Sequence, residues 1–335
     1  MRKNLIALFL LASVSLAAQD SAHKPGISSQ SQEKFLAIDA LTDSLKMKLD
    51  KTRLNHSNTR KWVIGTGTTA VYGTSFIYLN EAWYKGYPRS SFHAFNDFGE
   101  WKQVDKVGHA WSAYTTGRVT AALWQWAGVS KENSLLLGPG TSLLYMLSIE
   151  YLDGRSSEWG WSWGDVGADV FGSGLFVGQE LLWNKQRIQL KFSSHKKQYD
   201  ASLKTRADDL FGKTLPERLL KDYNAQTYWL SFNLNDFAKT KKLPAWLNIA
   251  FGYGASGMYG GDDNLAQDKS GNITFDRRDI KRYRQWYLAP DIDLTKIKTN
   301  SKVLRTVFFA LNSFKFPAPA LELSNGKLRG HFVKF

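Results

Sequence analysis

The first half of the chain contains four segments whose apolar pattern predicts helices. Residues 62–80 run for 19 positions without a formal charge, which is the length of a membrane-spanning helix. Three further helices are expected at about 104–128, 133–152 and 162–184, where few charged side chains interrupt the apolar residues. Four such segments with short connections predict a bundle of two helical hairpins.

A targeting segment is expected at the N-terminus. Arg2 and Lys3 precede an apolar run at residues 5–11, and small residues then lead to Ala18. This order is that of a secretory signal peptide, so residues 1–18 are expected to be removed on export.

A leading helix is expected between the signal peptide and the bundle. Over residues 31–51, apolar side chains recur at spacings of three and four among Asp, Glu and Lys, the pattern of an amphipathic helix. A polar stretch at 52–60 should separate this helix from the bundle. Residues 19–60 are therefore expected to form an amphipathic helix and a linker.

The pattern changes after Asn184 to short alternating or aromatic-rich runs separated by turn-forming residues, which predicts antiparallel strands. The expected strands lie at 227–234, 247–259, 284–294, 306–316 and 327–335. The turn Ser324-Asn325-Gly326 predicts a hairpin before the last run.

The predicted fold class is therefore α+β. An N-terminal bundle of about four Gly- and Trp-rich helices, at 61–184, is expected to be embedded in a membrane or to lie on one. A basic antiparallel β-rich region at 185–335 follows it. Most tryptophans of the bundle lie near the segment ends, as in an interfacial aromatic belt, although they would also fill the core of a soluble periplasmic protein.

Charge is distributed unevenly along the chain. The net charge is +14, and residues 184–335 hold 27 Lys and Arg against 14 Asp and Glu, whereas residues 1–183 hold 17 against 16. In an exported protein, this excess favours contact with membrane lipid, lipopolysaccharide or wall glycan rather than nucleic acid. A soluble basic surface without such a partner is the alternative. The sequence identifies no protein partner.

Three of the predicted helices each carry a pair of ionisable residues at a spacing of three or four, which places each pair on one helix face. Such groups are costly to bury among apolar residues, so they normally pair with one another, frequently at a functional site. The candidate catalytic residues are Asp105, His109, Glu150, Asp165 and Asp169. The candidate binding residues are Lys106, Asp153 and Arg155.

Three interpretations of these residues are open. In the first, they are structural: Asp105 caps a helix, His109 donates to a carboxylate, and Lys106 or Arg155 neutralises the remaining charge. In the second, they bind a ligand or substrate. In the third, Asp and His side chains ligate a divalent metal, although the sequence itself predicts no cofactor.

Two common catalytic signatures are absent from the sequence. It contains no Gly-rich phosphate-binding loop of the pattern Gly-x-x-x-x-Gly-Lys-Ser/Thr and no His-Glu-x-x-His pair. It also contains no cysteine, which excludes disulfides, thiolate metal sites and a lipid-modified cysteine.

The motifs around the candidate residues resemble a known family. The run Trp-Lys-Gln-Val-Asp-Lys-Val-Gly-His-Ala-Trp-Ser at 101–112, then Glu150, then Trp-Gly-Asp-Val-Gly-Ala-Asp-Val-Phe-Gly at 163–172 resemble the predicted periplasmic lipoproteins of domain of unknown function 2279. The same arrangement is similar, more distantly, to VanZ-like membrane proteins. The chain departs from these families in lacking the lipobox cysteine and in having Asp169 where a VanZ-like protein usually has Asn.

The resemblance implies an exported protein of the periplasm or a cell-envelope membrane, and it implies no particular reaction. We therefore expect a structural or binding component that contacts membrane lipid or an anionic envelope polymer. The alternative is a membrane-associated enzyme that acts on an envelope lipid or glycan through the Asp and His residues.

Overall fold

The structure of the chain, a computed structural model, describes residues 29–84, 88–238 and 242–334. The predicted signal peptide at 1–18 lies outside these residues. The chain divides into two units, Met1–Thr59 and Arg60–Phe335, and the second unit contains both the helical and the β-rich regions.

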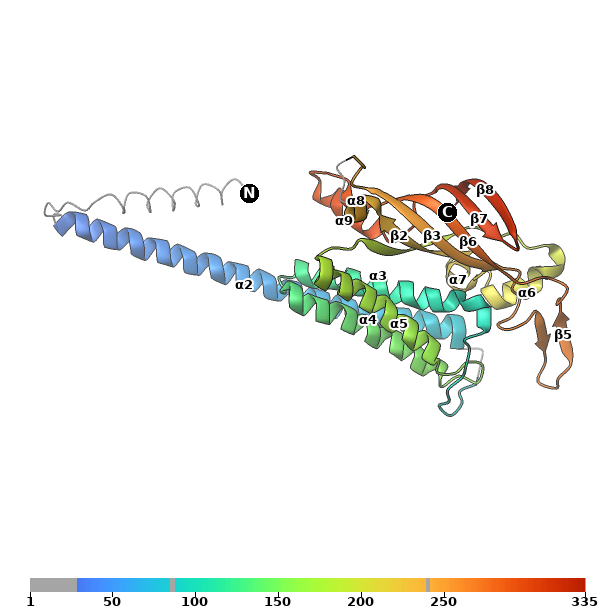
Figure 1. Ribbon diagram of the computed structural model, residues 1–335. Coiled ribbons are helices and arrows are strands. Elements are labelled where there is room, and N and C mark those ends of the chain that lie inside the picture. The colour runs from blue at the N-terminus through green and yellow to red at the C-terminus, as the bar shows by residue number, and fades with distance from the viewer. Residues whose placement is uncertain (1–28, 85–87, 239–241, 335) are drawn as a thin grey trace. The chain divides into compact units, whose positions relative to one another are not determined.

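Four long helices form the helical region, as the apolar pattern predicts. They are α2 (Ser29–Leu79), α3 (Val104–Trp126), α4 (Lys131–Asp153) and α5 (Trp163–Trp183). The bounds of α3, α4 and α5 agree with the predicted segments to within a few residues. Helix α3 lies between the other helices and the sheet, since it contacts α4, α5 and strands β1, β2 and β3 (Figure 1).

The expected separation of the leading helix from the bundle does not occur. Helix α2 continues through the polar stretch 52–60, which contains neither glycine nor proline to end it. Pro139 lies inside α4 without ending that helix. The neighbouring Gly138 serves packing, because a Cβ at this position would lie 2.6 Å from the Cβ of Ala121 on α3.

Six antiparallel strands form one sheet in the order β1-β2-β3-β6-β7-β8. They span Ile188–Ser194, Gln226–Asn233, Leu247–Ser256, Tyr283–Ile292, Ala318–Ser324 and Lys327–Lys334. The strands predicted to begin at 227, 247, 284 and 327 are confirmed. The β7–β8 hairpin is also confirmed: Asn325 and Gly326 have φ angles of 48° and 73°, the left-handed conformation that this turn requires.

The strand predicted at 306–316 is wrong, because helix α9 (Lys302–Leu311) occupies most of this segment. Val303, Val307 and Leu311 recur every four residues, which is a helical period. Ser301 caps the helix by accepting a hydrogen bond from the backbone N–H of Leu304. Aromatic residues within the run gave it the composition of a strand.

Strands β1 and β7 were not predicted, and neither were several shorter elements. The described part of the chain also contains η1 (Asn80–Tyr84), η2 (Glu100–Gln103), α6 (Ala201–Phe211), α7 (Leu215–Lys221), α8 (Leu234–Ala238) and η3 (Leu294–Lys296). Strands β4 (Leu265–Gln267) and β5 (Ile273–Asp276) form a separate hairpin.

The two faces of the main sheet have the reverse of the polarity usual in a soluble protein. Phe251, Leu288 and Leu321 lie side by side across β3, β6 and β7, and all three are exposed. On the opposite face, Lys191 and Asp291 are almost completely buried, and their Nζ and Oδ2 atoms lie 2.8 Å apart. Sheets in water normally bury the apolar face and expose the polar one.

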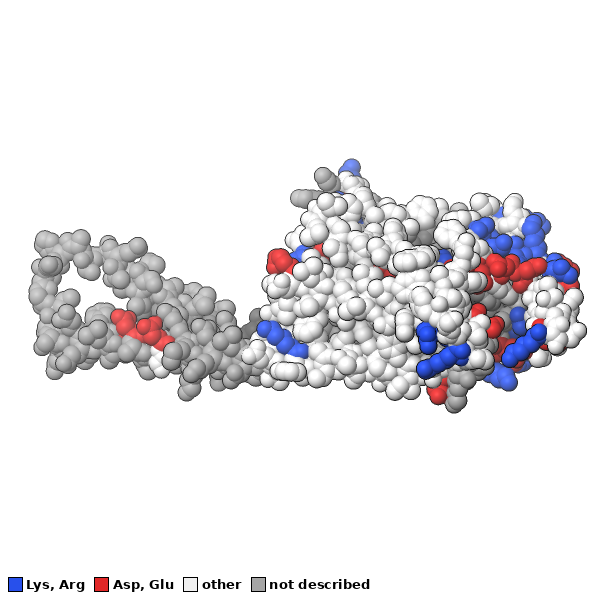
Figure 2. All heavy atoms as spheres, turned by 90° about the horizontal axis from the view of Figure 1, so that it is seen from below, with Lys and Arg blue, Asp and Glu red and all other residues white. Residues whose placement is uncertain are grey.

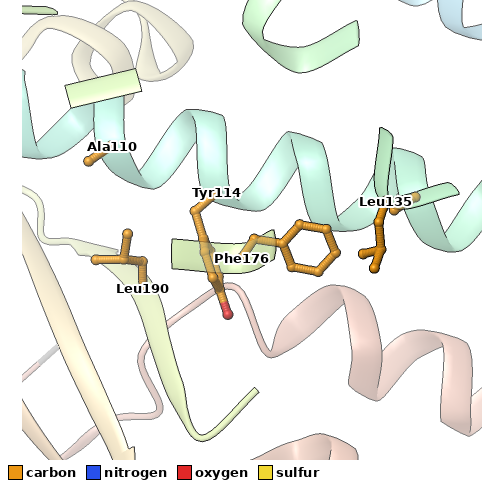
Figure 3. Close-up of a cluster of buried hydrophobic side chains, with 6 residues drawn as sticks. Ala110, Tyr114, Leu135, Phe176 and Leu190 are labelled. Atoms are coloured by element: carbon orange, nitrogen blue, oxygen red, sulfur yellow. The ribbon is translucent and has the colours of Figure 1, made fainter. Parts of the chain in front are cut away.

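A small apolar core joins the helices to the sheet. Tyr114 projects from α3 towards Leu190 of β1 and Phe176 of α5 (Figure 3). The rings of Tyr114 and Phe176 meet edge to face, with centroids 6.3 Å apart. Burying side chains of this size stabilises the contact by about 1.5–3 kcal/mol each, so this core fixes α3 against the sheet.

The close approach of α3 and α5 predicts a strong effect of substitution at Gly172. A Cβ there would lie 2.0 Å from the carbonyl oxygen of Ala110, so Gly172→Ala should lower the free energy of unfolding by about 1–3 kcal/mol. On the same helix, a Cβ at Gly174 would meet no neighbouring element within 4 Å, so Gly174→Ala should be neutral or slightly stabilising. Urea unfolding would compare the variants, and equal effects would contradict this packing.

Candidate functional site

Lys106 is the centre of a buried ionic cluster near the start of α3. Its Nζ atom lies 2.6 Å from Asp97 Oδ2. It also lies 2.9 Å from an oxygen of both Asp105 and Asp165. Burial opposes the charged form of Lys106, but attraction by Asp105 and Asp165 outweighs it, so the pKa of this lysine is raised above its usual value.

Three parts of the chain supply the carboxylates around Lys106, and Ser162 joins two of them. Asp97 belongs to the segment before α3, whereas Asp165 lies in the first turn of α5. Ser162 is the N-cap of α5: its hydroxyl accepts the Asp165 backbone N–H at 3.1 Å and donates to Asp97 Oδ1 at 2.6 Å. The cap of α5 therefore sets the distance between these two carboxylates.

His109 lies one helical turn after Asp105 and faces a second group of carboxylates. Its Nδ1 lies 3.2 Å from Asp169 Oδ1, and since an ionised carboxylate only accepts hydrogen bonds, the imidazole donates. Its Nε2 lies 3.7 Å from Glu150 Oε1 and 3.8 Å from Asp165 Oδ1. The second nitrogen therefore points at two carboxylate oxygens beyond ordinary hydrogen-bond distance.

Four carboxylate oxygens in this region form no hydrogen bond with the described residues. They are Asp105 Oδ1, Glu150 Oε1, Asp165 Oδ1 and Asp169 Oδ2. All four side chains are buried. A buried polar atom without a partner costs about 1–3 kcal/mol, so the cluster is incompletely satisfied by the protein alone.

Burial and charge shift the pKa values of these groups in opposite directions. Burial raises the pKa of Glu150 to about 8, although His109 opposes the shift. Burial lowers the pKa of His109, but attraction by Asp165 and Asp169 outweighs it and raises the value to about 10. Burial would raise the pKa of Asp165, but His109 and Lys106 hold it below its usual range.

A cavity of about 680 Å³ opens beside the cluster, lined by residues of α3, α4, β1 and β2. Its acidic wall includes Asp97, Asp105, His109, Asp153 and Asp165. The rest of the wall is largely aromatic: Tyr84, Phe95, Trp101, Trp111, Tyr145, Trp159, Phe192, Tyr223, Tyr228 and Phe314. The volume lies within the range of small-molecule sites, and the lining suits a ligand with both polar and apolar parts.

A left-handed turn precedes α3 at the edge of this cavity. Trp101, Lys102 and Gln103 have φ angles of 47°, 53° and 62°, which cost roughly 1–2 kcal/mol each in residues other than glycine. The β-rich region holds the turn: the Trp101 N–H donates to the Gly261 carbonyl at 2.8 Å, and Arg284 donates to Gln103 Oε1 at 2.6 Å. These contacts fix the start of α3 and the residues that follow it.

The structure brings all five candidate catalytic residues together with the candidate binding residue Lys106. Asp153 lies beside them and accepts a hydrogen bond from the Tyr84 hydroxyl at 2.7 Å. Arg155 is exposed in the turn after α4 and forms none of the ion pairs observed in the cluster. Asp105 does not cap α3, since the N-cap is Gln103.

Two important residues of the cluster, Asp97 and Ser162, were missed. Ser162 precedes Asp165 by three residues, and a serine at this spacing before an apolar run is a helix-cap signal that was present in the sequence. Asp97 lies in an irregular segment, where no periodicity indicates which side chains face inwards.

Two groups of side chains bring possible metal-ligand atoms within 4.8 Å of one another in the described part of the chain. Asp97, Asp105 and Asp165 form the first group, and His109, Glu150 and Asp165 form the second. The Lys106 ammonium already contacts every member of the first group. The second group is therefore the one with room for a cation.

Replacing Lys106 with Met should strongly destabilise the protein. The substitution leaves three buried carboxylates without their cation, so the free energy of unfolding should fall by about 3–5 kcal/mol. Lys131→Met is the matched control, because Lys131 pairs with Glu180 at the surface and such a pair contributes about 0–1 kcal/mol. Chemical unfolding would measure both variants, and a loss no larger than that of the control would show that Lys106 is not central.

Glu100 predicts a pH dependence of stability. Burial, with repulsion from Asp262 and Asp97, raises the pKa of its carboxyl from 4.5 to about 7. A raised folded-state pKa favours folding at low pH, and this contribution is lost as the pH rises from 4.5 through 7.

Glu100→Gln should therefore reduce the fall in unfolding free energy between about pH 5 and about pH 8. Urea unfolding at the two pH values measures the effect, with exposed Glu132→Gln as the control. A pH profile identical to that of the unsubstituted protein would rule out this contribution.

Comparison with known proteins identifies a family for the helical region. Residues 94–179 match a family described as predicted periplasmic lipoprotein, domain of unknown function 2279. Neither the curated proteins nor the solved structures gave a match. The family description confirms the expected location, an exported protein of the periplasm or cell envelope. The resemblance to domain of unknown function 2279 is thus confirmed over residues 94–179, the segment that carries the acidic cluster.

Proposed function

We propose that the protein is a binding component of the cell envelope whose apolar outer surface contacts membrane lipid and whose acidic cavity receives a ligand. One observation carries the proposal: in the second unit, apolar side chains are exposed on both helices and sheet while charged side chains are buried beneath them. A protein surrounded by water rarely exposes apolar surface on this scale.

The exposed face of the helical region is free of charge over a long distance. In α4, residues 133–149 contain no charged side chain, which corresponds to roughly 25 Å of helix. Leu136 and Leu144 on this helix are 73% and 68% exposed, and Leu181 and Leu182 on α5 are 73% and 77% exposed. Among the described helices, α4 has the length and composition to cross a membrane.

Figure 2 shows this face as a broad area without Lys, Arg, Asp or Glu, and the charged residues gather towards the end where the β4–β5 hairpin lies. Elsewhere, Arg60 stacks on exposed Trp126, a pairing typical of the membrane interface. An uncharged surface bordered by charge matches lipid hydrocarbon bordered by head groups. The basic excess of residues 184–335 would favour anionic head groups or envelope polymer.

The sheet, like the helices, exposes apolar side chains on its outer face. Trp286 and Leu323 face each other on β6 and β7 and are exposed, next to the row of Phe251, Leu288 and Leu321. The buried face carries ion pairs beside a small apolar cluster that includes Trp229 and Tyr287. Strands with apolar residues outside and polar residues inside are typical of proteins in contact with lipid.

A second function is a membrane-associated enzyme that acts on an envelope lipid or glycan. The position of His109 and Asp165 on the cavity wall favours it, because an imidazole and a carboxylate can exchange protons with a bound substrate. If the protein is an enzyme, substitution of His109 should abolish its activity. If His109 and Asp165 only bind a ligand, the substitution should weaken ligand affinity and there is no catalysis to lose.

Lipid contact can be tested by placing charge on the apolar face. Leu144→Glu combined with Leu182→Glu should lower co-flotation of the full-length protein with liposomes by about tenfold or more, since a glutamate is costly in hydrocarbon. Ile273→Glu is the matched control, because Ile273 is 57% exposed but lies on the β4–β5 hairpin. Circular dichroism should show that all variants are folded.

The lipid proposal fails if the unsubstituted protein does not float with liposomes, or if Ile273→Glu lowers flotation as much as the double variant does. Vesicles with and without anionic lipid distinguish apolar contact with lipid from contact of the basic region with anionic head groups. Tighter binding to anionic vesicles that weakens at high salt would support the basic contact, and equal binding to both would exclude it.

A further inference from the structure

We propose that His109, Glu150 and Asp165 form a binding site for one divalent transition-metal ion, with Asp169 as the residue that orients His109. The site lies at the acidic wall of the cavity, and its argument is independent of lipid contact. It rests on the directions of the ligand atoms, on their missing partners and on the charge around them.

The three ligand atoms converge on one point. His109 Nε2 lies 3.7 Å from Glu150 Oε1 and 3.8 Å from Asp165 Oδ1, and all three atoms lie within 4.8 Å of one another. A metal bonded to each at about 2.0–2.2 Å would hold them roughly 3.0–3.5 Å apart. The two distances from His109 would have to shorten by a few tenths of an ångström, and the two carboxylate oxygens, which lie within 4.8 Å of each other, would have to approach by up to roughly 1 Å.

Each ligand atom is free for this role in the described structure, and the rest of each side chain is held in place. Glu150 Oε1 and Asp165 Oδ1 accept no hydrogen bond, although both residues are more than nine-tenths buried. Their other oxygens are used: Glu150 Oε2 accepts the Ser162 N–H at 3.2 Å, and Asp165 Oδ2 accepts from Lys106 at 2.9 Å. Each carboxylate is thus anchored by one oxygen and directs the second towards His109.

Asp169 completes a second layer around the site. It accepts a hydrogen bond from His109 Nδ1 at 3.2 Å, which leaves Nε2 as the nitrogen available to a metal. A histidine that binds metal commonly donates its other N–H to a carboxylate, which fixes the ring and makes the free nitrogen more basic. Asp169 is completely buried, so this contact is protected from water.

Charge in the cluster is unbalanced without a further cation. Five carboxylates, those of Asp97, Asp105, Glu150, Asp165 and Asp169, surround one ammonium group and one imidazole. Even with the imidazole protonated, negative charges would outnumber positive ones if all five were ionised. A divalent ion at His109 would replace protons as the balancing charge, so its binding should release protons.

The donor set indicates the class of metal. One imidazole nitrogen with two carboxylate oxygens favours Zn²⁺ or another first-row divalent ion over Ca²⁺ and Mg²⁺, which prefer oxygen ligands alone. His109 and Asp165 also line the cavity, so the open side of the ion would face a ligand there. Three protein ligands with an open position are typical of a metal that contacts substrate.

The test is zinc binding by the metal-free full-length protein, measured by calorimetry and by elemental analysis after dialysis. We expect one tightly bound zinc per chain, a large loss of affinity in His109→Ala and Glu150→Gln, and a loss of about 10–100-fold in Asp169→Asn. Glu158→Gln is the matched control, because Glu158 is an exposed carboxylate between α4 and α5 that lies outside the cavity lining and the ligand group. It should bind zinc like the unsubstituted protein.

A second measurement needs no variant and guards against substitutions that prevent folding. Zinc should protect His109 from acylation by diethylpyrocarbonate in the unsubstituted protein, whereas exposed His93 should react equally with and without zinc. The proposal is overturned if the folded protein binds no zinc, or if zinc leaves His109 unprotected. It is also overturned if Glu158→Gln loses as much affinity as Glu150→Gln.

Discussion

The ammonium group of Lys106 is the interaction on which the helical region depends. One cation holds the carboxylates of Asp97, Asp105 and Asp165 at 2.6–2.9 Å, and so joins the segment before α3 to both α3 and α5. Without it, repulsion among three buried acids would separate these parts, because little water is present to screen them. Such a cluster contributes little net stability when complete but is strongly destabilising when one partner is lost. Its role is therefore to specify one arrangement of the helices.

The sheet also contains a buried ion pair. Lys191 and Asp291 pair beneath the strands, much as Lys106 and its acids pair between the helices. Where most proteins of this size rely on buried apolar area, this one places part of its apolar area outside and specific polar contacts inside. Lipid contact would account for the exposed apolar side chains. The buried polar contacts include the cluster around His109, in which carboxylates outnumber cations. The cavity lies beside the ionic cluster and is lined by α3, α4, α5 and the sheet.

The periodicity of apolar residues predicted the features that depend on neighbouring residues in the sequence, namely where helices lie and which side chains share a helix face. The bounds of α3, α4 and α5 and the placement of Asp105 and His109 one turn apart on α3 followed from the helical repeat alone. The partners of each pair depend on contacts between distant segments, so Asp97 was missed. For the same reason the sequence left open whether Lys106 or Arg155 neutralises the carboxylates, and in the structure it is Lys106 that contacts them. Helix α9 was mistaken for a strand because its aromatic residues gave the segment the composition of a strand.

The left-handed turn before α3 has a consequence for how this site is inherited. Every ionisable residue of the cluster lies within residues 94–179, yet Gly261, Tyr253 and Arg284 hold the turn from the β-rich region. The acidic motif is therefore not an independent module: moved to another protein without these strands, it would keep its sequence and lose its geometry. A relative with a different C-terminal region would need other residues to hold the turn, and those residues would give the cavity a different shape around the same acidic side chains.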